Sequence, residues 1–211
     1  MGVLVKICGI TRPEDAQAAY AAGAGAIGLN FAPESPRFLG DFMAARRLLD
    51  EAETRGRIAC AGVFVNPTVA DVFEAIAVVG LDIIQLHGEE TPEFVRELRN
   101  ISGRVPIWKA SRVSTAADLD MLYSYECDVW LIDAKAAGMR GGSGQTFNWR
   151  ILDALKREKP VVLAGGMNPG NVAQAIQEAN PDWVDVASGV ESAPGVKDHD
   201  LIRAFMQAVQ G

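Results

Sequence analysis

The sequence is poor in the residues from which disulfide frameworks and metal centres are built. Its 211 residues include three cysteines and two histidines. Cys8, Cys60 and Cys127 form no CxxC pair and are odd in number, which argues against a disulfide framework. His87 and His199 are too few for a histidine-rich metal centre. We therefore expect neither kind of site, and we expect Cys60 and Cys127 to be inert buried side chains.

Long apolar runs and a net positive charge are also missing. No run approaches the ~18 residues that a membrane span needs, and residues 1–9 lack the basic start and long apolar core of a signal peptide. The formal net charge of −7 argues against a nucleic-acid partner, although local arginines and helix N-termini can still attract a small anion. We expect a cytoplasmic protein without membrane or nucleic-acid partners.

What the chain does contain is a regular alternation of short β-branched runs and alanine-rich amphipathic segments. Hydrophobic residues make up 49% and charged residues 22%, which is typical of a soluble globular protein. The β-branched runs are continuously apolar, as expected for parallel strands covered by helices. Eight candidate strands occupy residues 3–7, 26–31, 58–65, 82–86, 105–110, 128–133, 161–164 and 183–187.

Helix signals separate these candidate strands. Residues 11–14, 66–68 and 91–93 combine Thr or Asn with an early Pro, as at helix N-termini, and Gly23 and Gly80 fit helix ends. Eight strand–helix units of about 26 residues each leave room only for short loops. The pattern predicts an α/β protein that is a single compact (β/α)8 TIM barrel over residues 1–211, with a doubly wound open sheet as the alternative.

Two small-residue loops follow the last two candidate strands. Glycine removes side-chain bulk where backbone N–H groups must approach an anion closely. A TIM barrel places its phosphate site at this point of the chain. The loops therefore predict a phosphate site at Gly165, Gly166, Ser188 and Gly189.

An ordered set of motifs resembles the phosphoribosylanthranilate isomerase family of tryptophan biosynthesis. The resemblance runs from residue 3 to about residue 206, and its specificity lies in the order of the motifs, since no single one is decisive. The motifs are KICGIT (6–11), SPR (35–37), GVFVN (62–66), QLHG (85–88), LIDAK (131–135), GGSGQTFNW (141–149), LAGGMNPGNV (163–172) and SGVESAPGVKD (188–198).

The resemblance implies a TIM barrel, a phosphosugar substrate, no cofactor and an Amadori rearrangement. In that aldose–ketose isomerisation, N-(5′-phosphoribosyl)anthranilate becomes 1-(o-carboxyphenylamino)-1-deoxyribulose 5-phosphate. The chemistry needs one acid to open the furanose and one base to remove the proton from carbon 2. The family pattern gives the base to Cys8 and the acid to Asp133. We expect Lys6 to lower the pKa of Cys8, and burial or negative charge to raise that of Asp133.

The resemblance also assigns the residues that bind the substrate. Arg37 is expected to hold the anthranilate carboxylate, because a guanidinium group matches a carboxylate bidentately. Lys6, Gln85 and Asp185 are expected to line the pocket. For His87, a structural role and a substrate contact both remain open. The family pattern adds Gly144, in the glycine-rich stretch 141–144, to the phosphate contacts.

Other readings of the same residues stay open. A ribulose-phosphate epimerase would need histidine and aspartate metal ligands, and a histidine-pathway sugar isomerase would carry Asp where this chain has Cys8. A non-enzymatic phosphosugar-binding protein would keep the glycine loops but need neither Cys8 nor Asp133. The sequence is compatible with a monomer or a homodimer. Asn30 interrupts an apolar strand, so we expect a local polar contact there.

Overall fold

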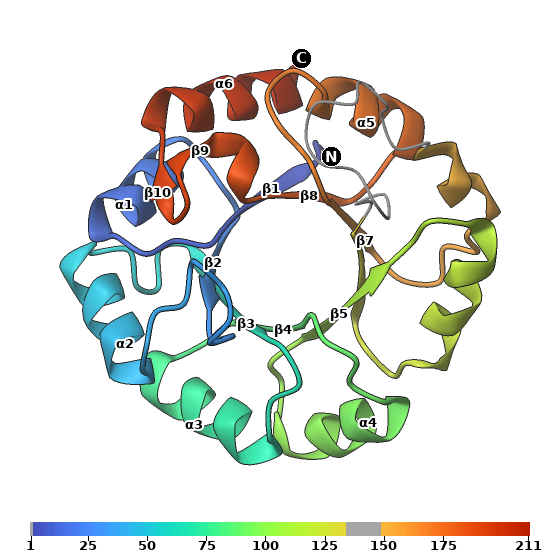
Figure 1. Ribbon diagram of the computed structural model, residues 1–211, viewed down its shortest axis with the longest axis horizontal. Helices are drawn as coiled ribbons and strands as arrows, with labels where there is room; N and C mark the ends of the chain where they lie inside the picture. The colour runs from blue at the N-terminus through green and yellow to red at the C-terminus, as the bar shows by residue number, and fades with distance from the viewer. Residues whose placement is uncertain (1, 134–148) are drawn as a thin grey trace.

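Eight parallel strands close into a barrel with helices around it (Figure 1). The computed structural model describes residues 2–133 and 149–211. The TIM-barrel prediction is confirmed and the open sheet is excluded, because the first strand pairs in parallel with the last. The strands are β1 (Leu4–Cys8), β2 (Ala26–Asn30), β3 (Ala59–Phe64), β4 (Ile83–Leu86), β5 (Ile107–Arg112), β6 (Val129–Asp133), β7 (Val161–Ala164) and β8 (Trp183–Val186).

The connections are mostly α-helices on the outside of the barrel (Figure 1). The described residues contain no helix with the length and apolar character needed to cross a membrane. The 3₁₀ helices η1 and η2 lie between β5 and β6 and between β6 and β7. The helices are α1 (Pro13–Ala21), α2 (Phe42–Glu51), α3 (Val69–Val79), α4 (Pro92–Ile101), α5 (Val172–Ala179), α6 (His199–Gln210), η1 (Ala116–Ser124), η2 (Trp149–Ala154) and η3 (Ser188–Val190).

The helix caps agree with the sequence except at α1. Thr68 and Thr91 cap α3 and α4, and Gly80 ends α3 in the left-handed region at φ 78°. The expected cap by Thr11 is wrong, because Arg12 occupies the N-cap position of α1 without a side-chain cap. The Thr11 hydroxyl instead donates to the carbonyl of Gly195.

A short antiparallel hairpin, which the sequence pattern does not predict, interrupts the last strand–helix unit. Its strands are β9 (Glu191–Ala193) and β10 (Val196–Lys197), and it lies between η3 and α6. The turn contains Gly195 at φ 80°, a conformation that favours glycine. The hydrogen bond from Thr11 therefore ties this hairpin to the loop that follows β1.

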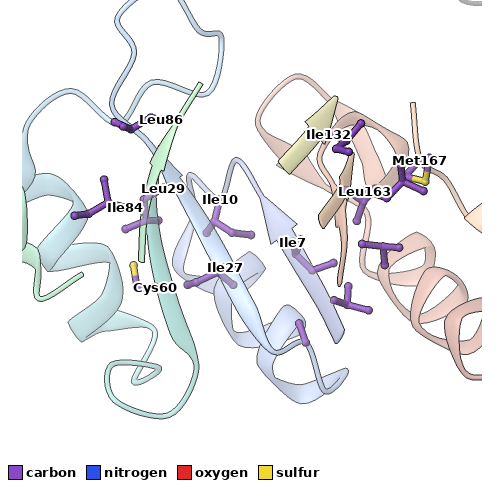
Figure 2. Close-up of a cluster of buried hydrophobic side chains, with 14 of the residues drawn as sticks. Ile7, Ile10, Ile27, Leu29, Cys60, Ile84, Leu86, Ile132, Leu163 and Met167 are labelled. Carbon is purple, nitrogen blue, oxygen red and sulfur yellow. The ribbon is translucent and has the colours of Figure 1, made fainter. Parts of the chain in front are cut away.

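Alternate residues of each strand face two different cores. One set packs between the strands and the surrounding helices; Figure 2 shows part of it, including Ile7, Ile27 and Leu29. Cys60 is buried in this outer core, where burial raises its pKa to about 12. The other set comes from the strands and fills the barrel axis with residues such as Ala61, Ala110 and Leu131.

A buried ion pair links the loop after β4 to the middle of β5. Glu90 Oε2 lies 3.0 Å from Lys109 Nζ, and the two side chains are 1% and 2% exposed. Glu90 also accepts hydrogen bonds from the amides of Asn66 and Gly88. Lys109 donates to the carbonyls of Gly88 and Ala110. These bonds satisfy both charges inside the protein.

Glu90→Gln should lower the free energy of unfolding by about 3–5 kcal/mol, because it leaves the Lys109 charge buried without its counter-ion. Equilibrium urea denaturation measures this loss. The control is Glu126→Gln, which breaks the exposed Arg96–Glu126 pair and should cost less than about 1 kcal/mol. Similar losses in the two variants would contradict the buried-pair argument.

Candidate active site

A pocket of about 700 Å³ opens at the carboxyl ends of the strands. This is the end at which TIM barrels carry their chemistry. Of the predicted site residues, the pocket brings together Cys8, Arg37, Gln85, Asp133, Gly165, Gly166, Asp185 and Ser188, along with His87 and Asn30. Lys6 and Gly189 are not among the residues that line it, and Gly144 falls outside the described residues.

Cys8 lies beside a buried ion pair inside the barrel. Lys6 Nζ donates to Asp185 Oδ1 at 2.9 Å, and the Lys6 side chain is fully buried. A Cβ atom on Gly28 would stand 2.7 Å from Cys8 Sγ and 3.1 Å from Lys6 Cε. Both side chains therefore point to the barrel axis, as their shared strand parity predicts, and only a glycine at position 28 leaves room for them.

The pKa of Cys8 differs from the expectation. Burial raises the pKa of the thiol, and the nearby Lys6 charge offsets this effect only in part. The expected lowering is therefore wrong, because the ammonium group is shared with Asp185 and the thiol is removed from water. Burial alone would lower the pKa of Lys6, but Asp185 and Cys8 raise it above its ordinary value. The arrangement is a protonated thiol next to a permanent positive charge.

Polar side chains from β4 and β6 form a second group in the pocket. Gln85 Nε2 lies 3.1 Å from His87 Nδ1, and His87 Nε2 lies 3.4 Å from Asp133 Oδ2. His87 thus links Gln85 to Asp133. Gln85 Oε1 is buried and has no hydrogen-bond partner among the described residues. Because Gln85 lines the pocket, this oxygen is available to accept a hydrogen bond from a ligand.

Asn30 and Arg37 lie on the β2 side of the pocket. The expected polar contact of Asn30 is confirmed, since its Oδ1 accepts the amide of Ala32 at 2.8 Å. Arg37 Nε and Nη2 donate to the two carboxylate oxygens of Glu191 at 2.7 and 2.5 Å. The sequence motifs do not predict Glu191 as a site residue. It lies within one of them, but nothing in the local sequence indicates that it meets Arg37 across 154 positions.

The two glycine loops meet at one side of the pocket. Gly165 and Gly166 have φ values of 90° and 67°, and neither amide donates to a backbone carbonyl within the described residues. A Cβ atom on Gly189 would stand only 1.8 Å from the carbonyl oxygen of Met167. Close packing of the loops therefore requires glycine at 189, and the amides at 165 and 166 suit an anion.

Metal ligands are not grouped anywhere in the described part of the chain. No cluster of three or more His, Cys, Asp or Glu residues there has the geometry to hold an ion. The pocket is lined by groups suited to acid–base chemistry, namely the thiol of Cys8, the imidazole of His87 and the carboxyl groups of Glu34, Asp133 and Asp185.

The sequence profile of a family described as N-(5′-phosphoribosyl)anthranilate (PRA) isomerase matches residues 5–208. The chain belongs to this isomerase family. The resemblance carried by the ordered motifs is therefore confirmed over nearly the whole chain.

Individual members of the isomerase family are similar over their full length. The N-(5′-phosphoribosyl)anthranilate isomerase of Paracoccus denitrificans (strain Pd 1222) is 46% identical over 211 residues, covering 98% of this chain and 96% of the relative. That of Rhodopseudomonas palustris (strain BisB5) is 43% identical over 215 residues, covering 100% of this chain and 97% of the relative.

Solved structures of the isomerase family share the fold. The Thermotoga maritima phosphoribosyl anthranilate isomerase is 40% identical with a TM-score of 0.89, and the match covers 99% of both chains. A second structure, 37% identical with a TM-score of 0.84 over 99% of both chains, is a complex with reduced 1-(o-carboxyphenylamino)-1-deoxyribulose 5-phosphate.

Inorganic phosphate should bind between the two glycine loops, and Gly189→Ala should weaken that binding at least about tenfold, or about 1.4 kcal/mol. The added methyl group must displace Met167 or the loop that carries position 189. Isothermal titration with phosphate measures the change. Gly170→Ala is the control, because its Cβ would meet only the side-chain oxygen of Asn168, at 3.2 Å. Unchanged affinity in Gly189→Ala, or an anion bound elsewhere in a crystal, would contradict this placement.

Proposed function

We propose that Cys8 and Asp133 catalyse the Amadori rearrangement of N-(5′-phosphoribosyl)anthranilate to 1-(o-carboxyphenylamino)-1-deoxyribulose 5-phosphate. The observation that carries the proposal is one pocket with a thiol at the end of β1 and a carboxyl group at the end of β6. These strands are not neighbours in the barrel, so a sugar between them meets one group on each side.

Ring opening is the task of Asp133. The carboxyl group donates a proton to the furanose oxygen, and the anilino nitrogen expels that oxygen to form a Schiff base. His87, 3.4 Å from Asp133 Oδ2 and held in turn by Gln85, orients the carboxyl group toward the pocket. The resulting iminium ion acidifies the proton on carbon 2 of the sugar.

Proton abstraction is the task of Cys8. Transfer of one proton from the thiol to the carboxylate of Asp133 gives a thiolate and a carboxylic acid without changing the net charge of the site. Burial, which raises the pKa of Cys8, makes the thiolate a stronger base than an exposed one. The positive charge of Lys6 stabilises that thiolate. Because its own side chain is fully buried, Lys6 affects the substrate only through its neighbours Cys8 and Asp185. The enolamine that forms then tautomerises to the ketone.

Substrate binding falls to the polar groups that surround these two. Arg37 takes the anthranilate carboxylate, and Gln85 and Asp185 take hydroxyl groups of the sugar. Backbone amides at positions 165, 166, 188 and 189 take the phosphate, with Gly144 as a proposed further contact. One acid and one base suffice for the reaction, so no step is assigned to a metal or a cofactor.

The setting of the reaction completes the proposal. Residues 1–211 act as one domain, in the cytoplasm, as a monomer or a homodimer. One related structure from Thermotoga maritima consists of monomers generated from a dimeric isomerase. This relative supports a homodimer as much as a monomer. No nucleic-acid or membrane partner is assigned. Loss of substrate fluorescence on turnover distinguishes the isomerase from a phosphosugar-binding protein.

Cys8→Ser should lower kcat by about 10²–10⁴-fold or more, because a hydroxyl group is far harder to ionise than a thiol. Asp133→Asn should also lose turnover, because it removes the proton donor. Affinity for a product analogue should stay near wild type in both variants. Steady-state kinetics and equilibrium binding measure the two quantities. Cys60→Ser and Cys127→Ser are controls at buried positions away from the pocket; turnover of Cys8→Ser at their level would overturn the assignment.

Arg37→Ala should raise KM and should weaken the binding of carboxylate-bearing analogues by about 1.5–3 kcal/mol, which is the cost of losing a charge-assisted pair. Analogues without the carboxylate should bind almost as before. Competitive inhibition constants for a matched pair of analogues measure the difference. Equal losses for the two analogues would show that Arg37 does not bind the carboxylate.

A further inference from the structure

The β9–β10 hairpin carries two charged side chains to which the proposed reaction assigns no role. Glu191 and Lys197 are register partners in the hairpin, and Glu191 Oε1 lies 2.8 Å from Lys197 Nζ. Their side chains are 5% and 0% exposed. A buried pair at the rim of a binding pocket needs an explanation, because burying two charges is costly.

Glu191 occupies one edge of the Arg37 guanidinium group, and none of the described residues accepts a hydrogen bond from Nη1 at the other edge. Its two oxygens accept from Nε and Nη2, which is the side-on bidentate geometry. A guanidinium group has five N–H donors, so Nη1 and the second proton of Nη2 form a separate fork. That fork suits a second carboxylate. Glu191 and a substrate carboxylate therefore do not compete for the same atoms.

Arg37 depends on this contact because its long side chain has many rotamers, whereas its backbone is held by a hydrogen bond from its amide to Ser35 Oγ. The residue lies in the loop between β2 and α2, and an arginine side chain loses about 2 kcal/mol of rotamer entropy when it is fixed. Its side chain runs across Gly9, where a Cβ atom would stand 2.2 Å from Arg37 Cδ. Because Gly9 has no side chain, the Arg37 side chain can lie across it. Glu191 then fixes the guanidinium group at the end of that side chain.

Lys197 anchors Glu191 to the barrel. Its ammonium group donates to the carbonyls of Cys8 at 2.6 Å and Ala187 at 3.1 Å as well as to Glu191, which uses all three of its protons. These carbonyls mark the ends of β1 and β8. Arg37 and Lys197 together outweigh Glu191 by one positive charge, so the group attracts an anion where an isolated Arg–Glu pair would be neutral.

We propose that Glu191 is a positioning residue for carboxylate recognition, which acts through Arg37. It holds the guanidinium group so that the Nη1–Nη2 edge faces the pocket, with Lys197 as its fixed anchor. This inference rests on the proposed function of Arg37 as the carboxylate clamp.

The test is a double-mutant cycle of Glu191→Gln and Arg37→Ala, read as KM and kcat for N-(5′-phosphoribosyl)anthranilate. Glu191→Gln alone should raise KM about tenfold and change kcat by less than about twofold, because it frees the clamp without touching the acid or the base. In the Arg37→Ala background the same change should add less than about twofold to KM, since the residue it positions is gone. The affinity for inorganic phosphate should stay constant throughout.

Glu191→Asp keeps the experiment decisive if Glu191→Gln fails to fold. The shorter side chain retains a charge for Lys197 but cannot also reach both nitrogens of Arg37, so the same rise in KM is expected. Asp128→Asn is the matched control: it breaks a bidentate pair with Arg99 away from the pocket and should leave KM unchanged.

Three results would overturn the inference. Wild-type KM in Glu191→Gln or Glu191→Asp would show that Arg37 needs no positioning. Fully additive effects in the double variant would show that Glu191 acts independently of Arg37. If Arg37→Ala itself leaves the discrimination between carboxylate-bearing and carboxylate-free analogues unchanged, the clamp of the proposed function fails, and the inference fails with it.

Discussion

The ion pair between Lys6 and Asp185 joins the closure of the barrel to the chemistry of the pocket. The two residues are register partners across the β1–β8 seam, so the pair forms where the first and last strands meet. A charged lysine in a barrel axis is tolerated only because the carboxylate lies 2.9 Å away. The same ammonium group is the charge that lowers the pKa of the Cys8 thiol most, against the larger effect of burial. Correct closure and the placing of a cation beside the Cys8 thiol are therefore one requirement, and a barrel that closed with β8 displaced would lose both.

The sequence predicts the barrel well because its signals are local. Continuous apolar runs place all eight strands within two residues at each end, and β7 is matched at both bounds. The errors lie where long-range contacts decide. Thr11 fails as a cap because a hydrogen bond to Gly195 is available, and the β9–β10 hairpin escapes notice because its strands contain only three and two residues. Glu191 and Lys197 are not predicted either, because their role depends on contacts between residues that lie far apart in the chain.

The pKa of Cys8 shows a further limit of reasoning from sequence. The nearness of Lys6 is apparent from the spacing, and it predicts a lowered pKa if the thiol stays hydrated. Burial has the larger effect and acts in the opposite direction. The extent of burial depends on the closing of the barrel around Gly28 and Asp185, which no local pattern specifies. The raised pKa means that little thiolate is present in the resting enzyme. It also means that the thiolate, once formed, is a stronger base.

The net charge of the chain repels an anionic substrate, whereas the cations at the pocket attract it. A formal charge of −7 repels a substrate that carries a phosphate and a carboxylate, but salt screens this repulsion beyond a Debye length of about 10 Å. Inside that distance, Lys6, Arg37 and Lys197 form ion pairs with the carboxylates of Asp185 and Glu191. Each carboxylate orients a cation instead of merely cancelling it, so the anion meets fixed donors. Recognition of the substrate therefore depends on how these pairs are arranged, and the overall charge of the protein contributes little to it.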